Sequence, residues 1–298
     1  MVQTTIALRV DVDTRRGLAS GVPRLLETLG RLEVRASFFV TMGPDRSGAA
    51  IRRLWRPGFI AKMLRTNPFR LYGVRTLLSG TLLPAEPVGA AFPDLLRVIV
   101  AEGHELAPHG FDHVGWQDGV HRWSPERIHE DMTAAARSLE AVLGTRPESS
   151  AAPGWRTTPT ALAVQEEFGY RYASDVRGAA PFRPIVGDGT LKTLQIPTTM
   201  PTMDELMGRV RDIATTLDQA LQPGLNVLTL HAEVEGGPLL GIFREFVNGA
   251  RARGAAFTRL DDVAEAAWRD PERLPSAPVS RNRVAGRSGW VAAPGILG

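Results

Sequence analysis

The chain contains no cysteine among its 298 residues. Disulfides and thiolate metal ligands are therefore excluded, and any metal site must be built from histidine and carboxylate side chains. No stretch reaches the roughly 18 to 20 consecutive apolar residues that a membrane-spanning helix needs. The N-terminus also lacks the basic and apolar segments of a signal peptide. We therefore expect a cytoplasmic protein without a membrane-spanning helix.

Acidic residues are missing from one long stretch, between Arg46 and Ala85, which carries eight basic residues interleaved with apolar and aromatic ones. This pattern is typical of a segment that docks on an anionic membrane surface. The residues expected to face the membrane are Arg52, Arg53, Trp55, Arg56, Phe59 and Lys62. A pair of lid helices with a solvated basic face is an equally weighted alternative. No recognisable nucleic-acid module accompanies the segment, so we expect no nucleic acid partner.

Strand-like and helix-like patterns alternate along most of the chain. Strands are predicted at residues 6–12, 36–41, 104–108, 149–152, 170–174, 193–196, 226–230 and 255–258. Helices are predicted at residues 21–33, 93–102, 125–143, 158–168, 203–221, 239–253 and 261–268. The alternation favours an α/β fold with a parallel sheet, either doubly wound or closed as a barrel. Residues 44–89 form an insertion, and residues 271–298, rich in Pro, Arg, Gly and Ser, are expected to be a disordered tail.

Side chains with catalytic chemistry follow several of the predicted strands. They are Asp11 and Asp13, His109 and His113, Trp155 and Arg156, Asp175, and His231. The carboxyl ends of parallel strands meet at one edge of an α/β fold, so we expect these residues to share one pocket.

Asp13, His109 and His113 have the chemistry of a metal site. Two histidines four residues apart and a carboxylate from another strand supply two nitrogens and one oxygen, which suits one divalent metal such as Zn, Mn, Co or Ni. Asp11 is placed to act as a base nearby. Each feature has an ordinary structural explanation, since a His pair is often structural and an Asp pair often caps a turn. Their meeting at one edge favours the metal centre.

The order of these motifs resembles that of the polysaccharide deacetylase superfamily. The matching segments are Asp11-Val12-Asp13, His109-x-x-x-His113, Ala151-Ala152-Pro153-Gly154-Trp155 and Leu228-x-x-His231. The resemblance implies an irregular seven-stranded (β/α) barrel over residues 1–270, with Asp11 as catalytic base and His231 as general acid. The superfamily usually has an arginine where this chain has Ala151. Arg156 is the expected substitute that orients Asp11, and Asp175 is expected to orient His231.

Within the superfamily, the segments Ser174–Gly178 and His231–Gly236 are similar to deformylases acting on 4-formamido-4-deoxy-L-arabinose linked to undecaprenyl phosphate. This implies an amide hydrolase of lipid A modification and polymyxin resistance, peripheral on the inner face of the cytoplasmic membrane, with a polyprenyl-phosphate-linked amino sugar as substrate and no obligate protein partner. Trp155 is the expected pocket wall beside the acyl group, and Arg177 and Arg183 are expected to bind phosphate. A deacetylase of another N-acylated amino sugar and an inactive glycolipid-binding barrel are the alternatives.

Overall fold

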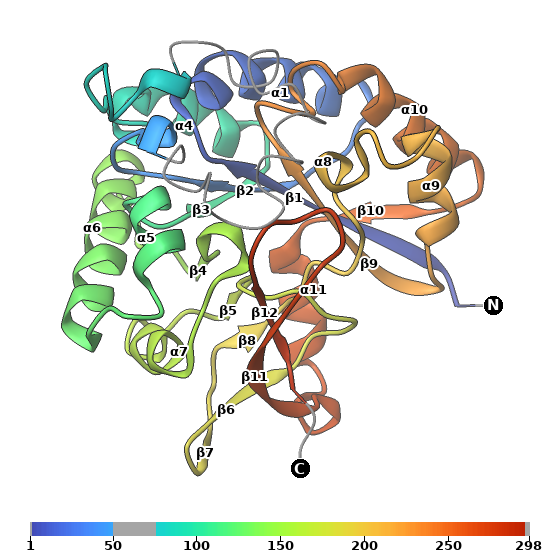
Figure 1. Cartoon of the computed structure of the whole chain (residues 1–298). Coiled ribbons are helices and arrows are strands. Elements are labelled where there is room, and N and C mark those ends of the chain that lie inside the picture. The colour runs from blue at the N-terminus through green and yellow to red at the C-terminus, as the bar shows by residue number, and fades with distance from the viewer. Residues whose placement is uncertain (1, 50–75, 296–298) are drawn as a thin grey trace.

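The computed structural model describes residues 2–49 and 76–295 (Figure 1). The residues expected to face a membrane lie outside these ranges; they are Arg52, Arg53, Trp55, Arg56, Phe59 and Lys62. None of the helices within the described ranges combines the length and the apolarity that crossing a bilayer would require.

Within the described residues, eight parallel strands form two sheets. The five-stranded sheet contains β1 (Thr4–Val12), β2 (Ser37–Val40), β3 (Glu105–Pro108), β9 (Gly224–His231) and β10 (Ala256–Thr258). The three-stranded sheet contains β4 (Ser149–Ser150), β5 (Tyr172–Ala173) and β8 (Leu194–Gln195). The expected α/β fold with parallel strands is therefore confirmed.

The two sheets adjoin at both edges through backbone hydrogen bonds rather than through a continuous ladder. At one seam the Ala151 N–H donates to the carbonyl of Pro108 at 3.1 Å. At the other, the Thr199 and Met200 N–H groups both donate to the Val227 carbonyl at 3.1 Å. The strands β1, β2, β3, β4, β5, β8 and β9 thus follow one another around the interior, with irregular joints.

The alternation of side chains along β1 separates two layers of core, because successive residues of a strand point to opposite faces. Ile6, Leu8 and Val10 belong to the large outer cluster that packs against the helices. Ala7 belongs to an inner cluster that also contains Phe39, Ala107, Ala151, Tyr172, Leu194 and Val227, contributed by the successive strands or the residues that follow them. Arg9 and Asp11 continue the inner face of β1 towards its carboxyl end.

The helices surround the strands (Figure 1). They are α1 (Val22–Arg31), α4 (Pro93–Ala101), α5 (His113–Gly119), α6 (Pro125–Leu143), α7 (Pro159–Glu166), α8 (Met203–Leu206), α9 (Ile213–Ala220), α10 (Leu240–Ala252) and α11 (Leu260–Trp268). Ser124 caps α6 as expected, since its hydroxyl accepts a hydrogen bond from the Arg127 N–H. The single helix expected over residues 203–221 is two helices, because the chain turns at Gly208, whose φ of +64° lies in the left-handed region that interrupts a helix.

The two ends of the insertion meet at its base. Pro44 and Pro87 form an antiparallel bridge, and the Asp45 N–H donates to the Glu86 carbonyl at 2.8 Å. Arg46 forms an ion pair with Asp112, the residue that caps α5. The described base of the insertion is therefore tied to the turn that carries His113.

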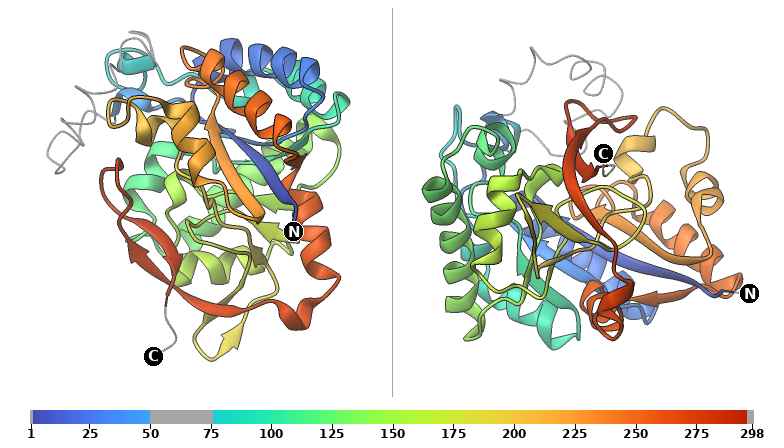
Figure 2. Two further views of the ribbon diagram at one scale, coloured as in Figure 1. Left: turned by 90° about the vertical axis from the view of Figure 1, so that its right-hand side faces the viewer. Right: turned by 90° about the horizontal axis from the view of Figure 1, so that it is seen from below.

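The C-terminal segment corrects the expectation of a disordered tail. Strands β11 (Ser276–Asn282) and β12 (Val291–Pro294) form an antiparallel pair. Strand β11 also pairs with β6 (Arg183–Val186), whose other neighbour is β7 (Gly189–Thr190). The apolar residues of the pair, Ala277, Val279, Trp290 and Ala292, pack on Val176 and Phe182, which explains why this polar-looking segment is ordered. Figure 2 shows the pair running across the body of the molecule.

Candidate metal centre

The strand register brings the predicted site residues to one edge. Asp11 of β1 lies opposite His231, the last residue of β9. On the other side of β1, Val12 pairs with Val40 of β2, which in turn pairs with Pro108 of β3, so His109 follows at the same level. Backbone pairing thus places residues from three strands beside one another.

Asp13, His109 and His113 converge with metal-ligand geometry. Their ligand atoms all lie within 4.8 Å of one another. The Nε2 atom of His109 is 3.4 Å from Oδ1 of Asp13, and Nε2 of His113 is 3.3 Å from Oδ2. Oδ1 of Asp13 is buried without a hydrogen-bond partner among the residues that the structure describes. Because an unsatisfied buried carboxylate oxygen is costly, this atom fits the role of a ligand to a divalent cation.

The ring of His109 is held in the tautomer that a metal ligand needs. Its Nδ1 lies 2.9 Å from the carbonyl oxygen of Ala151. A carbonyl only accepts, so Nδ1 carries the proton and Nε2 keeps its lone pair. Around His113, the side-chain nitrogen of Gln117 lies 3.3 Å from Nε2.

The charge state of Asp13 also suits a cation. Burial alone would raise the pKa of Asp13, but the electrostatic attraction of the neighbouring His113 and His109 outweighs burial. The pKa of Asp13 is therefore held well below its usual value of 3.8. With two imidazole nitrogens and one ionised carboxylate, the described residues fit Zn, Mn, Co or Ni.

Arg9, and not the expected Arg156, orients Asp11. The Arg9 side chain is 0% exposed and grips both carboxylate oxygens, with Nε–Oδ1 at 2.6 Å and Nη2–Oδ2 at 2.7 Å. Arg156 instead donates to the Gln117 carbonyl and stacks over Trp290. The prediction for Arg156 is therefore wrong. Arg9 was detectable in the sequence, because it lies two residues before Asp11 and must share its face of the strand.

Asp204, and not the expected Asp175, faces His231. Nδ1 of His231 lies 3.8 Å from Oδ1 of Asp204, a residue of the first turn of α8. Asp175 accepts hydrogen bonds from the Ala152 N–H and from two glutamine side chains, Gln165 and Gln195. Burial raises the pKa of Asp175 despite these bonds. Asp175 therefore supports the loop after β4 and does not contact His231.

Trp155 lies beside His231, where a pocket wall was expected. The two ring centroids are 6.2 Å apart, and the indole Nε1 donates to the Thr198 hydroxyl at 2.9 Å. Trp155 has a φ of +52°, in the left-handed region that few residues other than glycine adopt. Three guanidinium groups pack over its rings, at 5.2, 5.0 and 4.3 Å from the centroid, and belong to Arg9, Arg177 and Arg287.

The arginines expected to bind phosphate are directed to protein oxygens. Arg177 is buried, pairs with Glu205 at 2.6 Å and donates to the carbonyls of Thr198 and Met200. Arg183 donates to the carbonyl of Leu191 beyond the β6–β7 turn. These contacts speak against the phosphate role that the sequence suggested for the two residues.

The C-terminal segment contributes to the site, which the sequence did not indicate. Arg287 stacks on Trp155 and lies 3.5 Å from Glu205, the partner of Arg177. Gly289, with a φ of +86°, passes so close to Arg156 that a Cβ atom there would lie 2.6 Å from the guanidinium. The loop between β11 and β12 therefore packs against Trp155 and Arg156.

Comparison with known proteins places the chain in a family. A profile described as polysaccharide deacetylase matches residues 2–173. The "Probable 4-deoxy-4-formamido-L-arabinose-phosphoundecaprenol deformylase ArnD" of Shewanella sediminis (strain HAW-EB3) is 36% identical over 294 residues, covering 97% of this chain and 94% of that protein. The protein of the same description from Wigglesworthia glossinidia brevipalpis is 34% identical, covering 93% and 97%.

Solved structures share the fold at low sequence identity. A putative polysaccharide deacetylase from Mycobacterium smegmatis has a TM-score of 0.61 at 20% identity, covering 95% of this chain and 96% of that one. A probable polysaccharide deacetylase from Pseudomonas aeruginosa PAO1 has a TM-score of 0.60 at 17% identity, covering 90% and 92%. Together with the profile match over more than half of its length, these similarities show that the chain belongs to the polysaccharide deacetylase family.

Proposed function

We propose that this protein is a metal-dependent deformylase that removes the formyl group from 4-formamido-4-deoxy-L-arabinose linked to undecaprenyl phosphate. The coarser part, hydrolysis of an amide bond, follows from family membership. The finer part is supported by the relatives described as deformylases, which match this chain over nearly its whole length. The observation that carries the chemistry is the convergence of Asp13, His109 and His113 beside Asp11 and His231.

Asp13, His109 and His113 would hold the metal, and a bound metal supplies Lewis acidity towards the amide carbonyl and the attacking water. Asp11 takes the proton from that water, and Arg9 positions the Asp11 carboxylate through its two hydrogen bonds. The water oxygen joins the formyl carbon and the C–N bond breaks, which yields formate and a free amine.

His231 would protonate the departing nitrogen, because an amide nitrogen is a poor leaving group without a proton. Asp204 faces Nδ1 of His231 and is placed to orient the imidazole ring. Trp155 lies next to His231 and is our candidate for the wall that admits a formyl hydrogen but excludes an acetyl methyl.

The test is hydrolysis of matched lipid-linked substrates, followed by liquid chromatography with mass detection. We expect the formamido sugar to be converted about 10- to 200-fold faster than the acetamido analogue, the range that exclusion of one methyl group gives. Comparable rates would favour the alternative, a deacetylase of another N-acylated amino sugar. Binding of both lipids without hydrolysis by the metal-loaded protein would favour the inactive glycolipid-binding barrel.

A lipid-linked substrate fits a protein that works at the inner face of the cytoplasmic membrane, in lipid A modification and polymyxin resistance. For the membrane contact, the support is the basic and aromatic sequence of the insertion and the exposure of Leu82 at its described base, which is 80%. Co-sedimentation with anionic vesicles should weaken with salt. It should also weaken in a variant that combines Trp55→Ala with Arg52→Glu, Arg53→Glu and Arg56→Glu; equal binding of this variant and the parent would contradict the membrane contact.

A further inference from the structure

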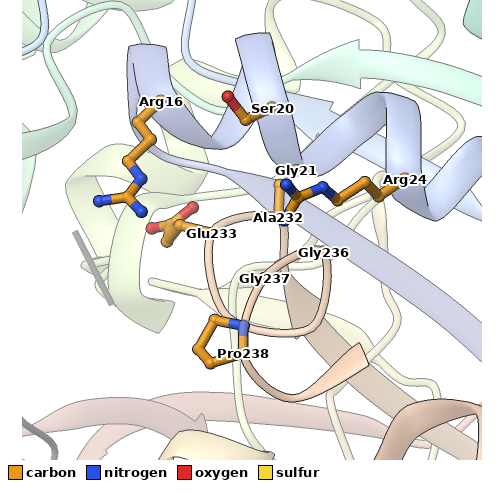
Figure 3. Close-up of a pocket in the computed structure, with 9 residues that line it drawn as sticks. All are labelled: Arg16, Ser20, Gly21, Arg24, Ala232, Glu233, Gly236, Gly237 and Pro238. Atoms are coloured by element: carbon orange, nitrogen blue, oxygen red, sulfur yellow. The ribbon is translucent and has the colours of Figure 1, made fainter. Parts of the chain in front are cut away.

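A cavity of about 360 Å³ lies between the start of the first helical segment and the loop after β9 (Figure 3). The lining residues on the first side are Arg16, Ser20, Gly21 and Arg24, and those on the second are Ala232, Glu233, Gly236, Gly237 and Pro238. Glycines let the two segments approach closely. A Cβ atom on Gly21 would lie 2.0 Å from the carbonyl oxygen of Ala232, and one on Gly236 would lie 2.5 Å from the carbonyl oxygen of Gly21.

The cavity carries an unbalanced positive charge. Arg16 and Arg24 are both exposed, and neither forms an ion pair with any residue in the described ranges 2–49 and 76–295. Figure 3 shows Arg16 beside Glu233 and Arg24 beside Gly21, with Ser20 between the two arginines in the chain. Two unpaired guanidinium groups with a hydroxyl are the donors that proteins use to bind phosphate oxygens.

Glu233 faces these arginines and points to a ligand with a further polar group. Its side chain is buried, with 5% exposure, yet Oε2 has no hydrogen-bond partner among the described residues. Burial and then the charge of Asp13 raise the pKa of Glu233 well above its usual value. A buried carboxyl group with an unpartnered oxygen can bond to a sugar hydroxyl.

The cavity adjoins the reaction site. Glu233 follows His231 by two residues, and Arg16 follows Asp13 by three. Asp13 is also the charge that acts most strongly on Glu233. A Cβ atom on Gly17 would lie 2.6 Å from Oε2 of Glu233 and 3.1 Å from the Thr14 hydroxyl, so little space separates Glu233 from the chain segment that leaves the metal centre.

We propose that this cavity binds the phosphate group of a phosphate-linked sugar substrate, with Arg16 and Arg24 contacting the phosphate and Glu233 contacting the sugar. This inference rests on the proposed function, because it places the phosphate of that substrate while the amide lies at the metal centre. It also replaces Arg177 and Arg183, whose guanidinium groups are directed to protein oxygens.

The experiment compares two formamido sugars, a short-chain polyprenyl-phosphate derivative and a methyl glycoside without phosphate. The quantity measured is the ratio of kcat/KM for the phosphorylated sugar to kcat/KM for the glycoside. We expect Arg16→Glu and Arg24→Glu each to lower this ratio by about tenfold or more, the scale of losing a charge-assisted hydrogen bond. Arg137→Glu makes the same charge change on the exposed face of α6 and should leave the ratio unchanged.

A parent ratio near one, or equal ratios in the parent and both variants, would overturn the phosphate site. If the parent hydrolyses neither sugar, the proposed function fails, and the site is then judged by calorimetric titration with decyl phosphate. Binding by the parent that is lost in Arg16→Glu and kept in Arg137→Glu would support the site. Equal binding by all three proteins, or no binding by the parent, would overturn it.

Discussion

Arg9 and Asp11 lie two residues apart on the inner face of β1 and form a two-point ion pair that is almost completely buried. Arg9 also donates to the carbonyl and the hydroxyl of Ser174. These contacts hold the carboxylate of Asp11 beside His109, whose Nε2 lies 3.6 Å from Oδ2 of Asp11. Both charges belong to the body of the protein, so the base is positioned before a substrate arrives.

We therefore predict that Arg9→Lys and Arg9→Met lower kcat, with the larger loss, about a hundredfold, in Arg9→Met. Lysine keeps the charge but not the two-point geometry. KM and the metal content should change little, which distinguishes positioning of Asp11 from a general loss of structure. Arg156→Met is the matched control, since Arg156 donates to the Gln117 carbonyl and packs on Trp290; a kcat loss equal to that of Arg9→Met would contradict this assignment.

We predict different roles for Asp11, which lies in β1, and Asp13, which follows this strand. His109→Ala, His113→Ala and Asp13→Asn should each lower the metal content measured by elemental analysis, because each removes one of three ligands. Asp11→Asn should retain the metal but lose rate by about a hundredfold or more. Full metal content in both histidine variants would show that the ligands are misassigned, and equal metal loss in Asp11→Asn and Asp13→Asn would show that the two carboxylates share one role.

We also predict different effects on kcat for His231, the proposed general acid, and for the aspartates Asp204 and Asp175. His231→Ala should lower kcat by about a hundredfold with a smaller effect on substrate binding. Asp204→Asn should lower kcat less, since it changes only the group that faces Nδ1 of His231 and leaves the imidazole in place. Asp175→Asn should change kcat per folded molecule by no more than a few-fold. Near-normal turnover in His231→Ala would leave that histidine a structural role only.

Trp155 should decide between formyl and acetyl substrates. Trp155→Leu opens space next to His231 and should lower the rate ratio of formamido to acetamido lipid by about tenfold, because a flexible wall excludes a methyl group poorly. Trp116→Leu is a control of equal size, since Trp116 is buried in a different apolar cluster. An unchanged ratio in Trp155→Leu would remove this residue from acyl selection.

Glu235 predicts how stability depends on pH. Its Oε2 accepts a hydrogen bond from the His231 N–H, and burial, followed by the charges of Asp204 and Asp11, raises its pKa well above 4.5. The folded state then holds a proton that the unfolded state has released, so this group lowers stability as the pH rises above 4.5. Glu235→Gln should have a higher Tm than the parent at pH 8, and the difference should shrink towards pH 4.

Glu166 is a control for which the pH dependence of stability has the opposite sign. Backbone N–H groups of Thr193 and Lys192 outweigh partial burial and hold the pKa of Glu166 below its usual value. Its contribution to stability is present above pH 4.5 and is lost as the pH falls. Glu166→Gln should therefore lower Tm at neutral pH. A Tm difference for Glu235→Gln that does not vary with pH would contradict the buried neutral carboxyl.

The sequence predicted that Asp13, His109 and His113 lie together because they follow strands whose register is fixed by apolar cores. It did not predict the residues that orient the catalytic groups. Arg9 was readable from the alternation of β1, whereas Asp204 reaches His231 only because the chain between β8 and α8 is shaped by contacts with distant strands, such as the bonds to Val227. Long-range packing of this kind leaves no local pattern in the sequence.

The C-terminal pair of strands shows the opposite error. Its Pro, Arg, Gly and Ser composition is typical of disorder. A few apolar residues nevertheless suffice to order the segment, because they pack on Val176 and Phe182. Composition measures what a segment could bury on average. It carries no information about the apolar surface that another part of the chain provides for the segment.

The position of Arg287 late in the chain affects the order in which parts of the protein fold during synthesis. Every strand of the two parallel sheets is synthesised before Arg287, which stacks on Trp155, and before Trp290, which packs on Arg156. Because segments fold as they emerge during synthesis, the sheets and the metal ligands can assemble first. The nascent protein would then pass through a stage in which Asp13, His109 and His113 are in place but Trp155 still lacks the packing of Arg287, so these three residues can assemble before the surroundings of Trp155 are complete.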